Sequence, residues 1–121
     1  NLNYSATPNL LLVNAGVYSL YSESSTDWIT RDLADKSLAK KISPIHLLRT
    51  GLPPMLIIHG TNDQSVDYAS AKAFAEEMEK LGNDFEFHTL EGAPHAIWFD
   101  IRFSGKVSEL RKAFLKKYGY E

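Results

Sequence analysis

The sequence predicts an α/β domain with a parallel three-stranded sheet and flanking helices. Three short apolar runs, each bounded by Gly, Pro or Asn, alternate with longer stretches in which apolar residues recur at helical spacing. The order strand, helix, strand, helix, strand, helix implies that each helix connects two parallel strands of one sheet. Such crossover connections are right-handed. With 121 residues, of which 44% are hydrophobic, the chain is long enough to form one such domain.

The first predicted strand is the run Leu10-Leu11-Leu12-Val13, which is apolar on both faces. Such a run is typical of an interior parallel strand, which needs a neighbour on each edge. Residues 25–42 have a helical pattern that Ser25 or Thr26 can cap and that Ser43-Pro44 ends. The predicted apolar side of this helix consists of Trp28, Ile29, Leu33 and Leu38.

The second predicted strand, residues 55–59, follows Pro53-Pro54, because proline is tolerated before a strand but not inside one. Asp67 is a candidate cap for the helix that comes next. The apolar side of that helix consists of Ala71, Phe74, Ala75, Met78 and Leu81.

The third predicted strand is less apolar than the first two. Phe85, Phe87 and Thr89 alternate with Glu86 and His88, which indicates one polar face and a position near a sheet edge. A last helix is predicted from a stripe at helical spacing that consists of Val107, Leu110, Phe114 and Tyr118.

Composition and charge exclude several classes of partner. A formal net charge of -2 and a pI near 6.1 argue against a nucleic-acid or anionic-membrane surface, because such surfaces need clustered Lys and Arg. No apolar run approaches the roughly 18 residues of a membrane span. There is no cysteine, and the four histidines lack the spacing of metal ligands. We therefore expect no metal, no cofactor, no nucleic acid and no membrane as partners, while the compartment stays undetermined. The basic cluster is interpreted as a solvated helix face and consists of Arg111, Lys112, Lys116 and Lys117.

Two loops contain a candidate acid and a candidate base. Asp63 follows the second strand through the turn His59-Gly60-Thr61-Asn62, and His95 follows the third strand through Gly92-Ala93-Pro94. Both lie after carboxyl ends of strands, where an open α/β sheet forms its ligand crevice, so they can converge. A neutral imidazole that accepts a serine proton, oriented by a buried carboxylate, is the chemistry of a Ser-His-Asp triad. No serine lies in a Gly-x-Ser-x-Gly sequence, so the nucleophile is expected upstream of this chain.

Each of these residues also has a simpler interpretation. Asp63 could only hydrogen-bond its own turn, and His95 could only contact loop backbone. Asp67 and Asp100 are rival acids, but Asp67 is better explained as a helix cap and Asp100 comes after the base. His59 is interpreted as a strand-end residue that points into the structure.

Several motifs resemble the C-terminal half of esterases in the α/β-hydrolase superfamily, above all carboxylesterases and acetyl-esterases. The matching stretches are Ile42-Ser43-Pro44-Ile45, Leu52-Pro53-Pro54, His59-Gly60-Thr61-Asn62-Asp63, Val66, residues 73–78 and Gly92-Ala93-Pro94-His95. The resemblance implies the C-terminal portion of an α/β-hydrolase fold, without the half that contains the nucleophile. Residues 1–121 then form a single partial domain, in which residues 1–41 are a strand and a helical excursion and residues 42–121 contain the acid and the histidine.

The resemblance implies an enzyme that cleaves small-molecule carboxylic esters, with Asp63 and His95 as catalytic residues. The family often has Gly after this histidine, whereas Ala96 stands here, so Trp98 and Phe99 could line a narrower substrate pocket or instead pack in the core. Two alternatives stay open, namely a non-catalytic binding module and a serine peptidase of the prolyl-oligopeptidase type. The isolated chain is expected to be inactive. It is also expected to form a homo-oligomer, or to associate with other segments, through an open strand edge between Leu10 and Val13.

Overall fold

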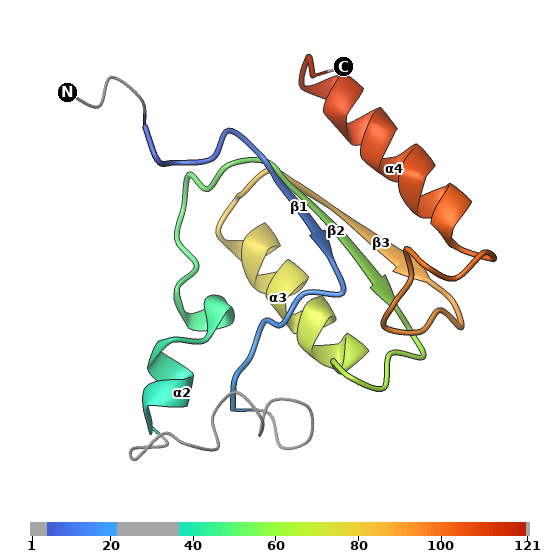
Figure 1. Cartoon of the computed structure of the whole chain (residues 1–121). Coiled ribbons are helices and arrows are strands. Elements are labelled where there is room, and N and C mark those ends of the chain that lie inside the picture. The colour runs from blue at the N-terminus through green and yellow to red at the C-terminus, as the bar shows by residue number, and fades with distance from the viewer. Residues whose placement is uncertain (1–4, 22–36, 121) are drawn as a thin grey trace.

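The computed structural model describes residues 5–21 and 37–120 (Figure 1). Three parallel strands form one sheet in the order β1-β2-β3, with Leu12 beside Leu56 and Leu56 beside Glu86. This parallel sheet with flanking helices confirms the predicted fold class. In chain order the elements are β1 (Leu11–Asn14), α2 (Ser37–Lys41), the 3-10 helix η1 (Pro44–His46), β2 (Met55–Gly60), α3 (Tyr68–Lys80), β3 (Phe85–Leu90) and α4 (Ser104–Lys117).

The side chains of β2 alternate between two core clusters on opposite faces of the sheet. Each face is covered by one long helix (Figure 1). Leu56 and Ile58 pack in a cluster with residues of α4, while Met55 and Ile57 pack in a second cluster with residues of α3. All six residues of β2 are buried. Full burial of one such aliphatic side chain stabilises a fold by about 1.5–3 kcal/mol, so β2 forms the centre of the core.

Helix α3 agrees closely with its sequence pattern. The Asp67 side chain accepts a hydrogen bond from the Ala69 N–H at 3.0 Å, which confirms Asp67 as the cap. Gly82, with φ of +66°, lies just beyond the end of the helix, where a residue without Cβ adopts this conformation most easily. The buried residues of α3 are Ala71, Phe74, Ala75 and Met78.

Helix α4 and strand β3 are also as predicted. Val107 and Phe114 are buried, and Leu110 and Tyr118 pack beside them. In the described sheet β3 is an edge strand, and its polar face contains an ion pair of Glu86 with His88 at 3.1 Å. Glu86 also pairs with Lys117 of α4 at 3.0 Å. The basic cluster is exposed, as interpreted, and consists of Arg111, Lys112, Lys116 and Lys117.

The region between β1 and β2 differs in part from its prediction. Of the helix expected over residues 25–42, the described chain contains α2, while Trp28, Ile29 and Leu33 lie outside the described residues. Leu38 does not belong to an apolar side, since it is 40% exposed and Ala39 is buried in its place. The Ser43 hydroxyl donates to the Ala39 carbonyl at 2.6 Å, so the predicted stop at Ser43 is confirmed.

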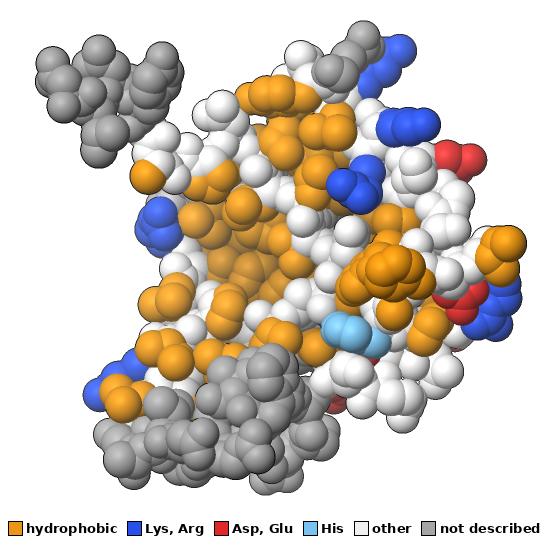
Figure 2. Space-filling view, viewed as in Figure 1, with side chains coloured by type: hydrophobic (Ala, Val, Ile, Leu, Met, Phe, Trp, Pro, Cys, Tyr) orange, Lys and Arg blue, Asp and Glu red, His pale blue; other side chains and the backbone are white. Residues whose placement is uncertain are grey.

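Strand β1 has a strand neighbour on one edge within residues 5–21 and 37–120, rather than the two that its apolar run calls for. It spans residues 11–14 instead of 10–13, and all four of its residues are only half-buried. Figure 2 shows hydrophobic side chains gathered in a hollow of the surface over β1 and α3. Strand β1 is thus an edge strand of the described sheet, as β3 is, although its run Leu11-Leu12-Val13 is apolar on both faces.

Candidate active site

Asp63 and His95 meet at the carboxyl-terminal edge of the sheet. Because β2 and β3 are neighbouring parallel strands, the loops that follow them begin side by side. The His95 Nδ1 atom lies 2.9 Å from Asp63 Oδ2. The convergence expected from the sequence is thus observed, although the two residues are 32 positions apart in the chain.

The Asp63 side chain is fully buried and both of its oxygens are hydrogen-bonded. Oδ1 accepts from the backbone N–H groups of Ser65 at 2.9 Å and Val66 at 2.8 Å. Oδ2 faces His95. Oδ1 therefore makes the turn contacts of the simpler interpretation and Oδ2 contacts the candidate base, while the catalytic role of Asp63 stays a prediction. Backbone bonds to Oδ1 fix the carboxylate plane, which leaves Oδ2 aimed at the imidazole.

The two loops are joined to each other by their backbones as well. The N–H groups of Thr61 and Asn62 donate to the carbonyls of Leu90 and Ala93, each at 3.1 Å. Gly60 allows this approach, because a Cβ there would lie 2.1 Å from the Ala93 carbonyl oxygen. The Gly92 N–H also donates to Thr61 Oγ1 at 2.8 Å. The spacing between acid and histidine is set by main-chain contacts.

The imidazole of His95 reaches the surface, with 37% of its side chain exposed. Its Nδ1 atom is occupied by Asp63, so Nε2 is the nitrogen left to exchange a proton with another group. The indole ring of Trp98 lies edge-on to this imidazole, with ring centroids 6.1 Å apart. The base is thus accessible, and an aromatic ring stands beside it.

Core packing, the alternative role for Trp98 and Phe99, is wrong for both. Trp98 is 39% exposed and Phe99 is 83% exposed. The short turn after His95 directs Ile97 into the core instead, where it is fully buried. An exposed aromatic pair beside an accessible histidine is a surface that apolar parts of a ligand could contact.

The rival acids lie in other contacts. Asp67 caps α3, and Asp100 binds its neighbour Arg102, whose hydrogen bonds lower the pKa of the Asp100 carboxyl. His46 contacts Tyr21 and His88 contacts Glu86. Among the described residues, no group of three His, Cys, Asp or Glu side chains could hold a metal ion. Nor does any helix in that part of the chain have the length and apolar character needed to cross a membrane.

Sequence reasoning missed one contact of the acid. His59 points into the structure as interpreted, but its Nε2 atom also lies 3.2 Å from Asp63 Oδ2. A sequence feature that could have indicated this contact is the spacing of four positions between His59 and Asp63 across the turn at Gly60.

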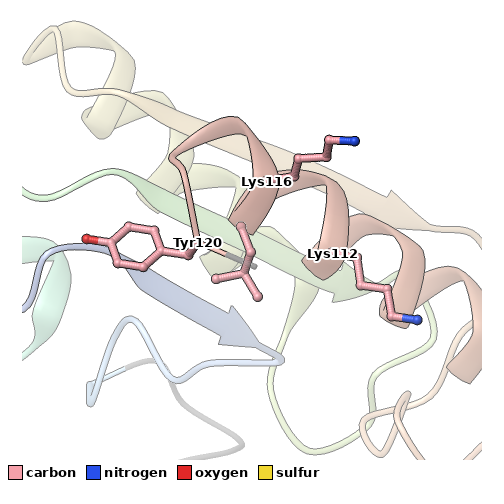
Figure 3. A pocket seen from close by; sticks show the side chains of 4 residues that line it. Lys112, Lys116 and Tyr120 are labelled. Carbon is pink, nitrogen blue, oxygen red and sulfur yellow. The ribbon is translucent and has the colours of Figure 1, made fainter.

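A pocket of about 220 Å³ lies elsewhere, beside the end of α4 (Figure 3). Lys112 and Lys116 extend from the helix at its rim, and Leu115 and Tyr120 complete the lining. It does not include Asp63 or His95. All four lining residues come from α4 and the segment just after it, so the pocket is separate from the contact of Asp63 with His95.

A helix-covered parallel sheet, in which neighbouring strands lead to a buried aspartate and then to a histidine in contact with it, defines the C-terminal part of an α/β-hydrolase. Comparison with known families agrees with this class. The chain belongs to the prolyl oligopeptidase family, whose model matches residues 8–119.

Solved structures of esterases are similar to this chain. Thermogutta terrifontis esterase 2 phosphoramylated by tabun is 34% identical, with a TM-score of 0.75, over 93% of this chain and 42% of that one. The propionate-bound form is 31% identical, with a TM-score of 0.73, over 99% of this chain and 46% of that one. The chain therefore spans less than half the length of these esterases.

A curated relative that is similar over a shorter stretch is also described as an esterase. A probable isoprenylcysteine alpha-carbonyl methylesterase of Arabidopsis thaliana is 38% identical over 48 residues, which are 40% of this chain and 10% of that protein. The predicted membership of the α/β-hydrolase superfamily is confirmed by the family match together with the esterase structures.

Proposed function

We propose that this chain contains the acid and the base of a serine hydrolase that cleaves carboxylic esters, with the serine supplied by a segment outside these 121 residues. The main support is the contact of 2.9 Å between Asp63 Oδ2 and His95 Nδ1, with the imidazole accessible from the surface. The esterase structures of similar sequence support the ester as substrate class.

In the proposed reaction, His95 Nε2 takes the proton of the serine hydroxyl while the serine oxygen bonds to the ester carbonyl carbon. The imidazolium then gives this proton to the leaving alcohol as the carbon–oxygen bond breaks, which leaves an acyl-enzyme. Water attacks the acyl group with His95 again as base, and the carboxylic acid leaves as serine regains its proton. Asp63 stays ionised throughout and stabilises the imidazolium.

Trp98 and Phe99 are proposed to contact the substrate. Both rings are exposed, and the Trp98 ring lies beside His95, where the ester must bind for proton transfer. Solved forms of the similar esterase are propionate bound and butyrate bound, which supports a small-molecule ester with a short acyl group.

Peptides are a second candidate substrate class, favoured by the family match over residues 8–119. Acyl transfer from an amide needs the same acid and base, so the pair of Asp63 and His95 does not distinguish the two classes. Comparing p-nitrophenyl acetate with a prolyl p-nitroanilide as substrates of one preparation would distinguish them.

The free edge of β1 is proposed as the place where the serine-containing segment associates. The Leu11 N–H donates to Pro54, just before β2, and the Ala15 N–H donates to Ile58 of β2. By alternation, the backbone groups of the residues at positions 12 and 14 point to the opposite edge. Residues 5–20 contain no charged side chain that would prevent strand addition. A second copy of the chain is the alternative occupant, and a non-catalytic binding module would use the same edge.

Ester hydrolysis by two preparations tests the proposal. The purified 121-residue chain is expected not to hydrolyse p-nitrophenyl acetate, whereas the polypeptide that includes the upstream segment is expected to do so and to lose activity with His95→Ala. Turnover by the 121-residue chain that disappears when one of its own serines is replaced would contradict the proposal.

A further inference from the structure

A second histidine contacts the acid from inside the protein. His59, near the end of β2, is 0% exposed. Its Nε2 atom lies 3.1 Å from the Val66 carbonyl oxygen and 3.2 Å from Asp63 Oδ2. The second of these is the same carboxylate oxygen that faces His95.

These contacts determine where the His59 proton is. A backbone carbonyl and a carboxylate oxygen only accept hydrogen bonds, so Nε2 must bear the hydrogen. Nδ1 is buried and has no hydrogen-bond partner. An N–H at Nδ1 would be a buried donor without an acceptor, which is costlier than a bare lone pair that faces carbon atoms. The tautomer with hydrogen on Nε2 and none on Nδ1 satisfies both ends of the ring.

The surroundings of the ring agree with a neutral imidazole. Its nearest aromatic neighbours are Tyr18 and Tyr68, with ring centroids 6.1 Å and 6.2 Å away. Burial raises the pKa of the Tyr18 phenol, so Tyr18 offers no anion to pair with a charged histidine. Asp63 is thus the one acidic side chain that contacts His59 within the described residues.

We infer that His59 is a positioning residue for the acid, which holds Asp63 Oδ2 from behind while His95 binds it from the surface. This inference rests on the proposed function. The carboxylate accepts hydrogen bonds from two backbone N–H groups and faces His95, while His59 Nε2 lies 3.2 Å from Oδ2 on the buried side. Polar groups therefore surround the buried charge without a cation among these contacts.

Two substitutions separate this role from simple packing. His59→Phe keeps a flat ring in the core but removes the donor, whereas His59→Gln keeps an N–H donor near the position of Nε2 but loses part of the ring volume. If His59 only filled space, Phe would be the better replacement. If it orients Asp63, Gln would preserve the contact between Asp63 and His95 and Phe would not.

The test is NMR of the 121-residue chain with ¹⁵N-labelled histidine, which requires no nucleophile. His59 is expected to be neutral with its hydrogen on Nε2. The Nδ1 proton of His95 is expected to give a signal protected from exchange with water. His59→Phe should accelerate that exchange on the order of tenfold, the scale of losing one polar contact to a charged group, and His59→Gln should largely restore it.

A His59 that bears its hydrogen on Nδ1, or on both nitrogens, would overturn the inference from the parent chain alone. Retention of the His95 signal in His59→Phe together with its loss in His59→Gln would overturn it too. If His59→Phe fails to fold, the inference is still tested by the tautomer of His59 in the parent chain and by the His95 proton signal in His59→Gln. Failure of the hydrolysis test would instead reject the proposed function and leave the His59 hydrogen bonds as they are.

Discussion

Strands β1 and β2 are neighbours in one sheet and have the same kind of sequence, a short aliphatic run. Their environments differ. Every residue of β2 is buried between two strands and two helices, whereas the four residues of β1 are half-buried beside a single strand in the described chain. β2 ends at the acid, and β1 ends where Asn14 Oδ1 is buried without a hydrogen-bond partner.

The difference shows what an apolar run indicates. It predicts that a strand needs cover on both faces and both edges, but not that the cover lies within the same segment of chain. Around β2 the described residues supply both neighbouring strands and both covering helices. Around β1 they supply a strand on one edge, and the serine-containing segment is proposed to associate at the other edge.

The largest expected effect is at the end of β2. In the polypeptide that supplies the serine, Asp63→Asn should preserve the fold but stabilise the wrong tautomer of His95, with turnover reduced on the order of 10⁴-fold. His95→Ala should be at least as damaging. Steady-state kinetics with p-nitrophenyl acetate measures both. Near-normal turnover of either variant would reject the catalytic assignment, and Asp100 should then be tested as the acid.

A matched pair across the two strands gives the next largest effect. Leu56 and Leu12 are register partners that pack in the same cluster, but Leu56 is 0% exposed and Leu12 is half-buried. Leu56→Ala should lower the free energy of unfolding by about 2–5 kcal/mol, and Leu12→Ala by clearly less. Urea unfolding of the 121-residue chain compares them. Equal losses would mean that another segment already covers β1.

The free edge of β1 should be visible in amide exchange. At low concentration the N–H groups of Leu12 and Asn14 should exchange on the order of tenfold faster than that of Leu11, which bonds to Pro54. At micromolar concentration, light scattering should detect a dimer or larger assembly, and the difference should shrink as the edge is covered. A monomer in which Leu12 and Asn14 are already protected would reject the open edge.

The smallest expected effect distinguishes two aspartates that follow β2. Asp67→Ala removes the cap of α3 and should lower the free energy of unfolding by about 1 kcal/mol. Because Asp67 does not contact His95, turnover should stay unchanged in the polypeptide that supplies the serine. A large loss of activity with little loss of stability would show that Asp67, and not Asp63 alone, contributes to the active site.

Much of the fold follows from the sequence, because its strongest signals are local. The cap Asp67, the buried side of α3 and the stripe of α4 were each predicted by spacing alone. The order of Asp63 and His95 relative to their strands also predicted their meeting. Parallel strands bring their carboxyl ends together whatever the loops contain.

The remainder depends on contacts between distant residues, which no local pattern encodes. The exposure of Trp98 and Phe99 depends on Ile97 taking the inward position after His95. The role of His59 depends on how the turn at Gly60 folds back, so that a strand residue meets the acid four positions later. Whether the edge of β1 is covered depends on which segment pairs with it, and the apolar run of β1 does not specify that segment.

The backbone hydrogen bonds between the loops of Asp63 and His95 determine which substitutions in these loops evolution can tolerate. Because the N–H groups of Thr61 and Asn62 bind the other loop, a side chain such as that of Asn62 can be exchanged without moving Asp63 from His95. Two positions are restricted: Thr61, whose Oγ1 accepts from the Gly92 N–H, and Gly60, where any added Cβ would collide with the Ala93 carbonyl. Substitutions at the exposed positions 98 and 99 could therefore alter what is bound while the contact between Asp63 and His95 is inherited intact.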